Sequence, residues 1–382
     1  MRNQKNIKKL SLVNKNGWHQ SLLTPKQMLS INSSSNYLFK LHEELLIEAK
    51  EDNQTELFKC CIRSVFRNSK NARIFAKEIA LHALSQDLSL KGFYITKPYL
   101  LYHLPDDKKE EGHFHTDYLK GVGFSMTSWT SLDNYRLIYP PITLINRSHS
   151  QLGNLLYRLI RRFKITDRQY IKIYKLLKKK SIDIKPEANN TFIWDSNLIH
   201  KGNLNTGSKA HFAVAIRITE LPLYYEPSIK IKDLLNDKHI LPKNKVIDCR
   251  KLYSYANNWL NKIINHSGTI YNFVDKFYET SRNEIREEYL ESLGFAFSIF
   301  AQRYPNQPYS LKCDLFSYLI SLDNIVSLER FLISLRKYEQ KKILVKISEY
   351  RDFNSYQENF ILRKLNLTRN SDLRHDGAII TW

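Results

Sequence analysis

GHFHTDY, residues 112–118, is the stretch of sequence from which the fold is inferred. In an extended strand, alternate side chains point to the same face, so His115 and Asp117 can bind one metal ion. His113 shares that face and competes as a ligand. A His113–His115 pair would be more typical of a cupin or zinc site. An exposed turn is the other alternative, because His-x-Asp alone is a weak signal in a chain with 12 histidines.

A third ligand has to come from another segment, and His200 is the candidate. It ends the apolar stretch TFIWDSNLIH, residues 191–200, and the polar stretch KGNLNTGS follows it. Two neutral imidazoles and one carboxylate on one face of Fe(II) form the facial triad of non-haem oxygenases. Imidazole binds iron, zinc and copper alike, so the residue types leave the metal open. Asp195 is interpreted as part of a solvated turn.

Strand-like segments lie on both sides of these residues. They are rich in β-branched and aromatic residues, and turn signals separate them. Such a run of short strands predicts an all-β sandwich or barrel. The segments span residues 92–104, 121–132, 140–150, 191–200 and 211–219.

Helical patterns flank the strands. Apolar residues recur every three or four positions over residues 37–85, which predicts two or three amphipathic helices after a Ser/Asn-rich loop at 32–36. Strand patterns stop near residue 225, and residues 253–365 indicate successive helices, as a bundle or a degenerate tetratricopeptide-type array. We therefore predict an α+β fold with two domains. The first covers residues 1–225, and an all-α C-terminal domain covers residues 250–382.

The charge of the chain is strongly positive, with 59 Lys and Arg against 38 Asp and Glu, or +21. A basic surface attracts phosphates, carboxylates and nucleic acid, although a compositional bias toward Lys, Asn and Ile is the alternative explanation. A predicted helical insertion at residues 151–185 has 11 basic and 2 acidic residues, or 11 − 2 = +9. We hypothesise that it recruits an anionic substrate. A solvated helix face is the alternative.

The remaining composition indicates an intracellular protein. Neighbouring cysteines rarely pair and no CxxC spacing occurs, so free thiols in a reducing compartment are predicted. No apolar run approaches the roughly 20 residues of a membrane span, and the basic N-terminus lacks an apolar segment behind it. We predict a cytoplasmic location and expect no nucleic-acid partner, because no nucleic-acid-binding signature is found. The cysteines are Cys60, Cys61, Cys249 and Cys313.

Four segments in order resemble the phytanoyl-CoA dioxygenase family of Fe(II)- and 2-oxoglutarate-dependent oxygenases, over roughly residues 90–220. After the His-x-Asp motif, SMTSWTSLDN at 125–134 is similar to the family's strand ending in a Leu-Asp turn. LINRSH at 144–149 is similar in type and place to its GSH-like element, and residues 191–208 to the strand and turn around the distal histidine. The resemblance implies a double-stranded β-helix, a jelly-roll or cupin-like barrel, with Fe(II) held by His115, Asp117 and His200.

The resemblance also implies an oxidoreductase. Such a dioxygenase uses O₂ and 2-oxoglutarate to hydroxylate a small organic substrate. In the family, an arginine eleven residues past the distal histidine binds the distal carboxylate of 2-oxoglutarate, but that position holds His211 here. Arg217, 217 − 200 = 17 residues past His200, shares a strand face with His211. We predict Arg217 as the carboxylate's partner, with His211 as a second one, and Tyr102 in the cosubstrate pocket.

A binding protein is the alternative function. The barrel would then be a catalytically degenerate oxygenase, acting through its basic surface and its C-terminal helices, which would bind a protein partner. The missing arginine at residue 211 favours this alternative.

Overall fold

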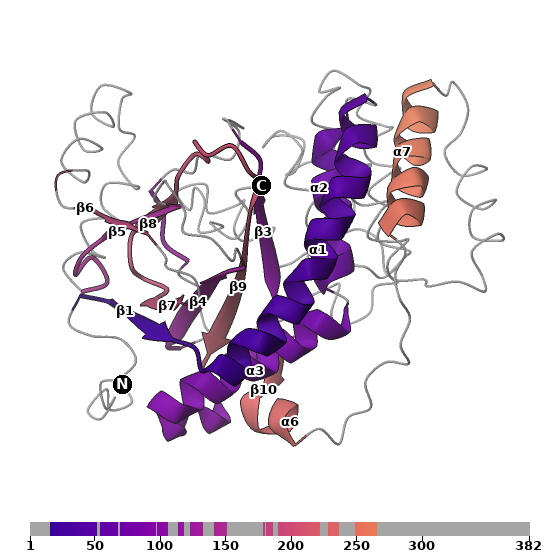
Figure 1. Cartoon of the computed structure of the whole chain (residues 1–382). Coiled ribbons are helices and arrows are strands. Elements are labelled where there is room, and N and C mark those ends of the chain that lie inside the picture. The colour runs from indigo at the N-terminus through magenta and orange to yellow at the C-terminus, as the bar shows by residue number, and fades with distance from the viewer. Residues whose placement is uncertain are drawn as a thin grey trace, which may run out of the picture.

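The fold combines helices with antiparallel sheet (Figure 1). It is seen in a computed structural model, which describes the following residues: 16–51, 54–67, 69–96, 98–105, 114–117, 123–132, 141–150, 179, 181–185, 190–221, 228–236 and 249–265.

The larger sheet has the strand order β1-β7-β4-β9-β2-β10, and β3 pairs with β9 outside this path. Every pair in it is antiparallel. The smaller sheet has the order β6-β5-β8 and is also antiparallel. The strands are β1 (Trp18–Leu22), β2 (Tyr94–Thr96), β3 (Tyr99–His103), β4 (Ser125–Ser131), β5 (Ile142–Ile145), β6 (Ser181–Ile184), β7 (Asn190–Asp195), β8 (His200–Gly202), β9 (His211–Thr219) and β10 (Ser228–Lys230).

The two sheets enclose one apolar core. Alternate side chains of a strand point to opposite faces, and apolar side chains from the inner faces of both sheets form the core cluster. Trp129, Phe192 and Ala213 of the larger sheet pack in one cluster with Ile142 and Leu144 of the smaller sheet. Each of them is at most 6% exposed, so the strands are held face to face by burial of their inner side chains.

Helices cover the other face of the larger sheet (Figure 1). On β3 and β9, outward-facing Tyr102 and Phe212 stack on each other and meet His42 of the first helix, which hydrogen-bonds the Tyr102 hydroxyl. Phe58 of the second helix contacts Tyr102 and also Tyr253 of the last described helix. The helices are α1 (Pro25–Glu51), α2 (Thr55–Arg67), α3 (Lys70–Gln86), the 3₁₀-helix η1 (Leu88–Gly92), α6 (Ile231–Leu235) and α7 (Cys249–Asn265).

The first helix begins earlier than predicted. The Ser/Asn cluster at residues 32–36, expected to be a loop, lies inside α1. A capping box explains the start: Thr24 N donates to Gln27 Oε1 at 2.9 Å, and Gln27 N donates to Thr24 Oγ1 at 3.3 Å. Pro25 follows at the first helical position, which suits its fixed φ. Packing of α1 on α2 and α3 then outweighs the weak helix propensity of Ser and Asn.

Each predicted segment contains a strand, and four further strands, β1, β6, β8 and β10, accompany them. The end of the segment predicted as a helix, residues 151–185, is instead strand β6, in which Ile182 and Ile184 alternate with polar residues and pair with β5. Strand β1 and strand β10 also escaped prediction, and β10 lies beyond the predicted limit of the strands. The rest of the basic insertion, apart from Lys179, lies outside the described residues.

The two sheets do not close into a hydrogen-bonded barrel over the described strands, so the predicted barrel is observed as two facing open sheets. Helix α7 confirms the start of the predicted C-terminal helices and packs against α2. Residues 266–382 lie outside the described part, so the two-domain division stays a prediction. Among the described cysteines, Cys60, Cys61 and Cys249, no disulfide is formed. None of the described helices is both long and apolar enough to cross a membrane.

His82 of α3 makes the fold sensitive to acid. Burial, and then the neighbouring charge of His19 on β1, lower the pKa of the His82 imidazole below 6.5. The unfolded chain therefore binds this proton more readily than the folded chain. The resulting loss of stability is absent above pH 6.5 and grows as the pH falls through the lowered pKa.

We expect the free energy of unfolding, measured in urea, to fall between about pH 7.5 and about pH 5.5. His82→Gln, which cannot gain this proton, should show a shallower fall. Some slope should remain, because burial also lowers the pKa of His42 and of His149. Equal slopes in the two proteins would contradict the assignment.

A candidate metal centre of two histidines and one aspartate

Backbone pairing brings His115 and His200 together. His115 N donates to His200 O at 2.8 Å, and His200 N donates to His115 O at 2.8 Å. Two residues that exchange both bonds in an antiparallel pair project their side chains to the same face. The two imidazole rings accordingly lie with their centroids 4.3 Å apart. Segments 85 residues apart in sequence thus present two nitrogen ligands side by side.

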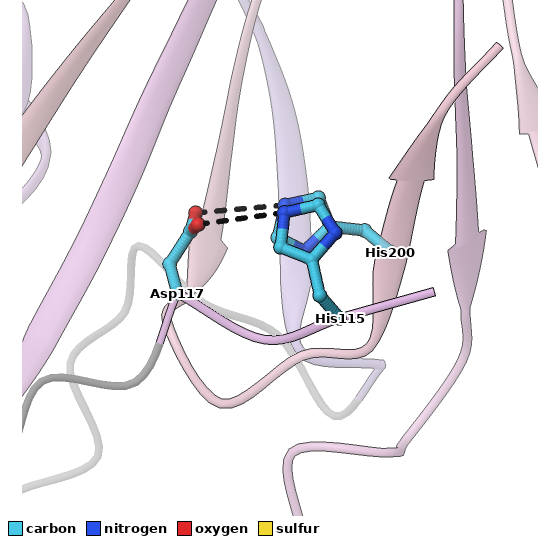
Figure 2. A group of neighbouring side chains, drawn as sticks. All are labelled: His115, Asp117 and His200. Carbon is cyan, nitrogen blue, oxygen red and sulfur yellow. Dashed lines mark ion pairs between the residues drawn. The ribbon is translucent and has the colours of Figure 1, made fainter. Parts of the chain in front are cut away.

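Asp117 completes the group, as Figure 2 shows. His115 Nε2 lies 3.9 Å from Asp117 Oδ1, and His200 Nε2 lies 3.6 Å from Asp117 Oδ2. One ligand atom from each residue falls within 4.8 Å of the others. The side chains of Asp117 and His200 are buried, whereas that of His115 is 16% exposed. The group therefore lies at the edge of the interior and is open on the side of His115.

A tight turn joins β7 of the larger sheet to β8 of the smaller sheet, which begins at His200. Asp195 ends β7, and its carboxylate accepts hydrogen bonds from the backbone and side-chain amides of Asn197. Burial, opposed by these bonds and by His149, raises the pKa of Asp195. The Ser148 hydroxyl donates to Ile145 O at 2.8 Å and accepts from Ile199 N at 2.7 Å. Asp195 and Ser148 are thus used to shape the turn.

The ring orientation of His200 is fixed by its own backbone. Its Nδ1 lies 3.0 Å from the carbonyl oxygen of Leu198, which can only accept. The proton of the neutral imidazole is therefore on Nδ1, and the lone pair is on Nε2, which faces Asp117. A histidine held in this way is ready to bind a metal through Nε2.

The carboxylate of Asp117 stays ionised in its buried position. Burial alone would raise the pKa of Asp117, but His200, Arg217 and His115, together with a hydrogen bond from Thr127, lower this pKa to about 2. Thr127 Oγ1 donates to Oδ2 at 2.8 Å, and Trp194 Nε1 donates to the same oxygen at 3.4 Å. A charged carboxylate next to two imidazoles is the state that a divalent cation requires.

The spacing of the group fits a small divalent ion. Neighbouring ligands of an octahedral ion, bound at about 2.1 Å, lie about 3 Å apart. The observed 3.6 Å and 3.9 Å would have to shorten by less than about 1 Å. Two imidazoles and a carboxylate are also the donor set of non-haem iron sites with open positions. The residues present therefore fit such an ion.

Arg217 lies on the same side of the sheet as the triad. It is opposite Thr127 in the β4–β9 register, and Thr127 is opposite Trp194 in the β4–β7 register, so these residues share the inner face. Its charge also lowers the pKa of Asp117. Arg217 therefore supplies positive charge next to the three candidate ligands.

His211 and Tyr102 are not brought to the triad. His211 is six residues from Arg217 on β9, about 20 Å along a strand, and its ring packs near those of Trp129 and His103. Tyr102 points to the opposite face of the sheet, where it meets His42 and Phe212. Tyr102 is therefore buried between the larger sheet and the helices, and not between the two sheets. His113, the competing ligand, lies outside the described residues.

Thr127 and Trp194 are the site residues that the sequence did not indicate. Both occur in strands that were predicted correctly. Trp194 is a core residue, only 3% exposed, and its indole N–H reaches Asp117. A tryptophan six residues before a candidate ligand is a signal only once strand register is known.

Comparisons with known proteins give distant structural likenesses. No family model and no curated protein matches the sequence. Solved structures to which the chain is similar include AviO1 from Streptomyces viridochromogenes Tue57, with 13% identity and a TM-score of 0.36 over 56% of this chain and 95% of that one. The alpha-ketoglutarate-dependent carbocyclase SnoK from nogalamycin biosynthesis has 10% identity and a TM-score of 0.32, over 57% and 85%.

EctD from S. alaskensis, solved with bound Fe, has 11% identity and a TM-score of 0.33, over 56% of this chain and 76% of that one. The neighbours named here include non-haem, iron-binding or alpha-ketoglutarate-dependent proteins by their own descriptions. TM-scores this low do not define a shared fold, so the function is inferred from the geometry of the site.

The triad can be tested by metal titration. We expect the protein to bind one Mn²⁺, and each of His115→Ala, Asp117→Ala and His200→Ala to weaken binding by at least about 100-fold, because each removes one of three ligands. Calorimetric titration measures this. His19→Ala, on β1 and outside the triad, is the control and should bind normally. Wild-type affinity in all three variants would exclude the site.

Proposed function

We propose that the chain is a non-haem Fe(II)- and 2-oxoglutarate-dependent oxygenase, similar to phytanoyl-CoA dioxygenase, which hydroxylates a small organic substrate. One observation carries the proposal: the buried, ionised Asp117 faces Nε2 of both His115 and His200 within 4 Å. The order of the four sequence segments and the two facing antiparallel sheets agree with a double-stranded β-helix. These features favour iron over a purely structural role for the triad.

The chain's residues would hold and orient the reactants. His115, Asp117 and His200 would bind Fe(II) on one face, leaving three positions for other ligands. When bound, Fe(II) with 2-oxoglutarate and O₂ supplies the oxidation of a C–H bond, with release of succinate and CO₂. The apolar core beneath the triad, including Trp194 and Leu198, would keep water from the inner side. No protein side chain has to act as a general base.

Arg217 would bind a carboxylate of 2-oxoglutarate. Its guanidinium matches a carboxylate in geometry, and it lies on the inner face next to Thr127. His211 is too far along β9 to share the same five-carbon cosubstrate, so Arg217 and His211 are alternatives and not partners. The ring of the buried Trp129 packs against that of His211. This contact favours Arg217 over His211 as the residue that binds the carboxylate.

The substrate is proposed only as a class. An anionic small molecule agrees with the net charge of +21 and with the concentration of basic residues at 151–185. The alternative, a degenerate oxygenase that acts as a binding protein, predicts no turnover at all.

The deciding experiment measures succinate formation. Protein loaded anaerobically with Fe(II) and then given 2-oxoglutarate and air should form succinate slowly without substrate and faster with it. Asp117→Ala should reduce the rate at least about 100-fold, since it removes a metal ligand. Wild-type protein that holds iron but yields no succinate would overturn the proposal in favour of the binding protein.

Substitution of Arg217 tests the cosubstrate assignment. Arg217→Leu should raise the KM for 2-oxoglutarate by roughly 10- to 100-fold, because it removes a charge-assisted hydrogen bond worth about 1.5–3 kcal/mol. Arg217→Lys should lose less. Steady-state kinetics of succinate formation measures both. His211→Leu is the comparison: if it raises this KM and Arg217→Leu does not, the carboxylate's partner has been misassigned.

A further inference from the structure

We propose that Thr127 and Trp194 are positioning residues that turn Asp117 into a ligand through one oxygen, Oδ1. The inference rests on the proposed function in one respect, namely that the triad binds a metal ion. It adds which oxygen binds, and which side chains outside the triad decide this.

Both donors reach the same carboxylate oxygen. Thr127 Oγ1 donates to Asp117 Oδ2 at 2.8 Å, and Trp194 Nε1 donates to Oδ2 at 3.4 Å. Each oxygen of an ionised carboxylate has about two lone-pair sites. Two donors therefore occupy Oδ2, which also lies 3.6 Å from His200 Nε2. Among the described residues none donates a hydrogen bond to Oδ1, which lies 3.9 Å from His115 Nε2. A cation placed among the three residues would meet Oδ1 as the available donor.

The two donors are held rigidly. Thr127 and Trp194 are opposite each other in the antiparallel register of β4 and β7, and each is only 3% exposed. Trp18 of β1 is opposite Trp194 on the other side, and its indole N–H is fixed by Asn146 Oδ1 at 2.7 Å. Both donors thus lie in the middle of a paired, buried row, where neither can move away without breaking strand packing.

One-oxygen binding has a consequence for the open positions. If both oxygens of Asp117 bound the ion, one of the three positions left by the triad would be taken. Holding Oδ2 away from the ion keeps that position available. Thr127 and Trp194 would then control coordination number as well as affinity, which a purely structural residue would not do.

The chain offers a matched pair of threonines for the test. Thr127→Val removes the hydroxyl that reaches Asp117, whereas Thr130→Val makes the same change three residues along β4. The Thr130 hydroxyl is also buried, but it donates to Thr191 Oγ1 at 2.9 Å on the opposite face. Both variants lose one buried hydrogen bond, and only the first should change metal binding. Trp194→Phe has a similar control in Trp129→Phe, which removes another buried indole N–H from the inner face.

The probes are Mn²⁺, followed by calorimetry, and Co²⁺, whose visible absorption bands change with coordination number. Thr127→Val should weaken Mn²⁺ binding roughly 10- to 100-fold and change the Co²⁺ spectrum. Trp194→Phe should weaken Mn²⁺ binding by roughly 3- to 10-fold, since its bond is longer. Thr127→Ser, which keeps a hydroxyl, should restore affinity. Thr130→Val and Trp129→Phe should bind like wild type.

The outcomes separate this inference from the proposed function. Wild-type affinity and an unchanged Co²⁺ spectrum in both Thr127→Val and Trp194→Phe would overturn the inference alone, provided that wild-type protein binds Mn²⁺ and His200→Ala does not. Equal losses in Thr127→Val and Thr130→Val would also overturn it, because the effect would then be general destabilisation. Failure of wild-type protein to bind either ion would instead overturn the proposed function.

Discussion

The pair of backbone hydrogen bonds between His115 and His200 is the constraint on which the site depends. It pairs the short segment at residues 114–117 with the start of strand β8 of the smaller sheet. Because of this pairing, the two imidazoles lie on one face, and Asp117, two residues after His115, lies next to both of them. The turn from β7 to β8, shaped by Asp195 and Ser148, presents the His200 side of this pair.

Burying a carboxylate is costly unless charges and hydrogen bonds compensate for it. Around Asp117 the larger sheet supplies that compensation through one row of its inner face, in which Thr127, Trp194 and Arg217 are neighbours across strands. This row of polar and charged side chains stabilises the core less than apolar side chains would in the same places. An ionised aspartate beside two histidines in this place agrees with the proposed metal site.

Much of this was predictable from local sequence. His115, Asp117 and His200 were identified by strand alternation and by the position of His200 after an apolar run, and the structure brings them together. The strands that carry the core were found because β-branched and aromatic residues cluster in them. Two predictions were wrong because tertiary contacts decide the structure there. The Ser/Asn cluster predicted as a loop lies inside α1, which packing keeps helical. The end of the predicted helix at residues 151–185 is strand β6, which forms by pairing with β5. The Thr24–Gln27 capping box was a local signal that went unused, whereas the roles of Thr127 and Trp194 required the register of β4 and β7.

The most direct test of the central claim is a crystal structure of the protein soaked with Fe(II) and 2-oxoglutarate without oxygen. We expect one ion within about 2.0–2.3 Å of His115 Nε2, His200 Nε2 and one oxygen of Asp117, as for other first-row metals bound to nitrogen and oxygen. An ion bound elsewhere, or histidine rings that remain uncoordinated at saturating iron, would contradict the account.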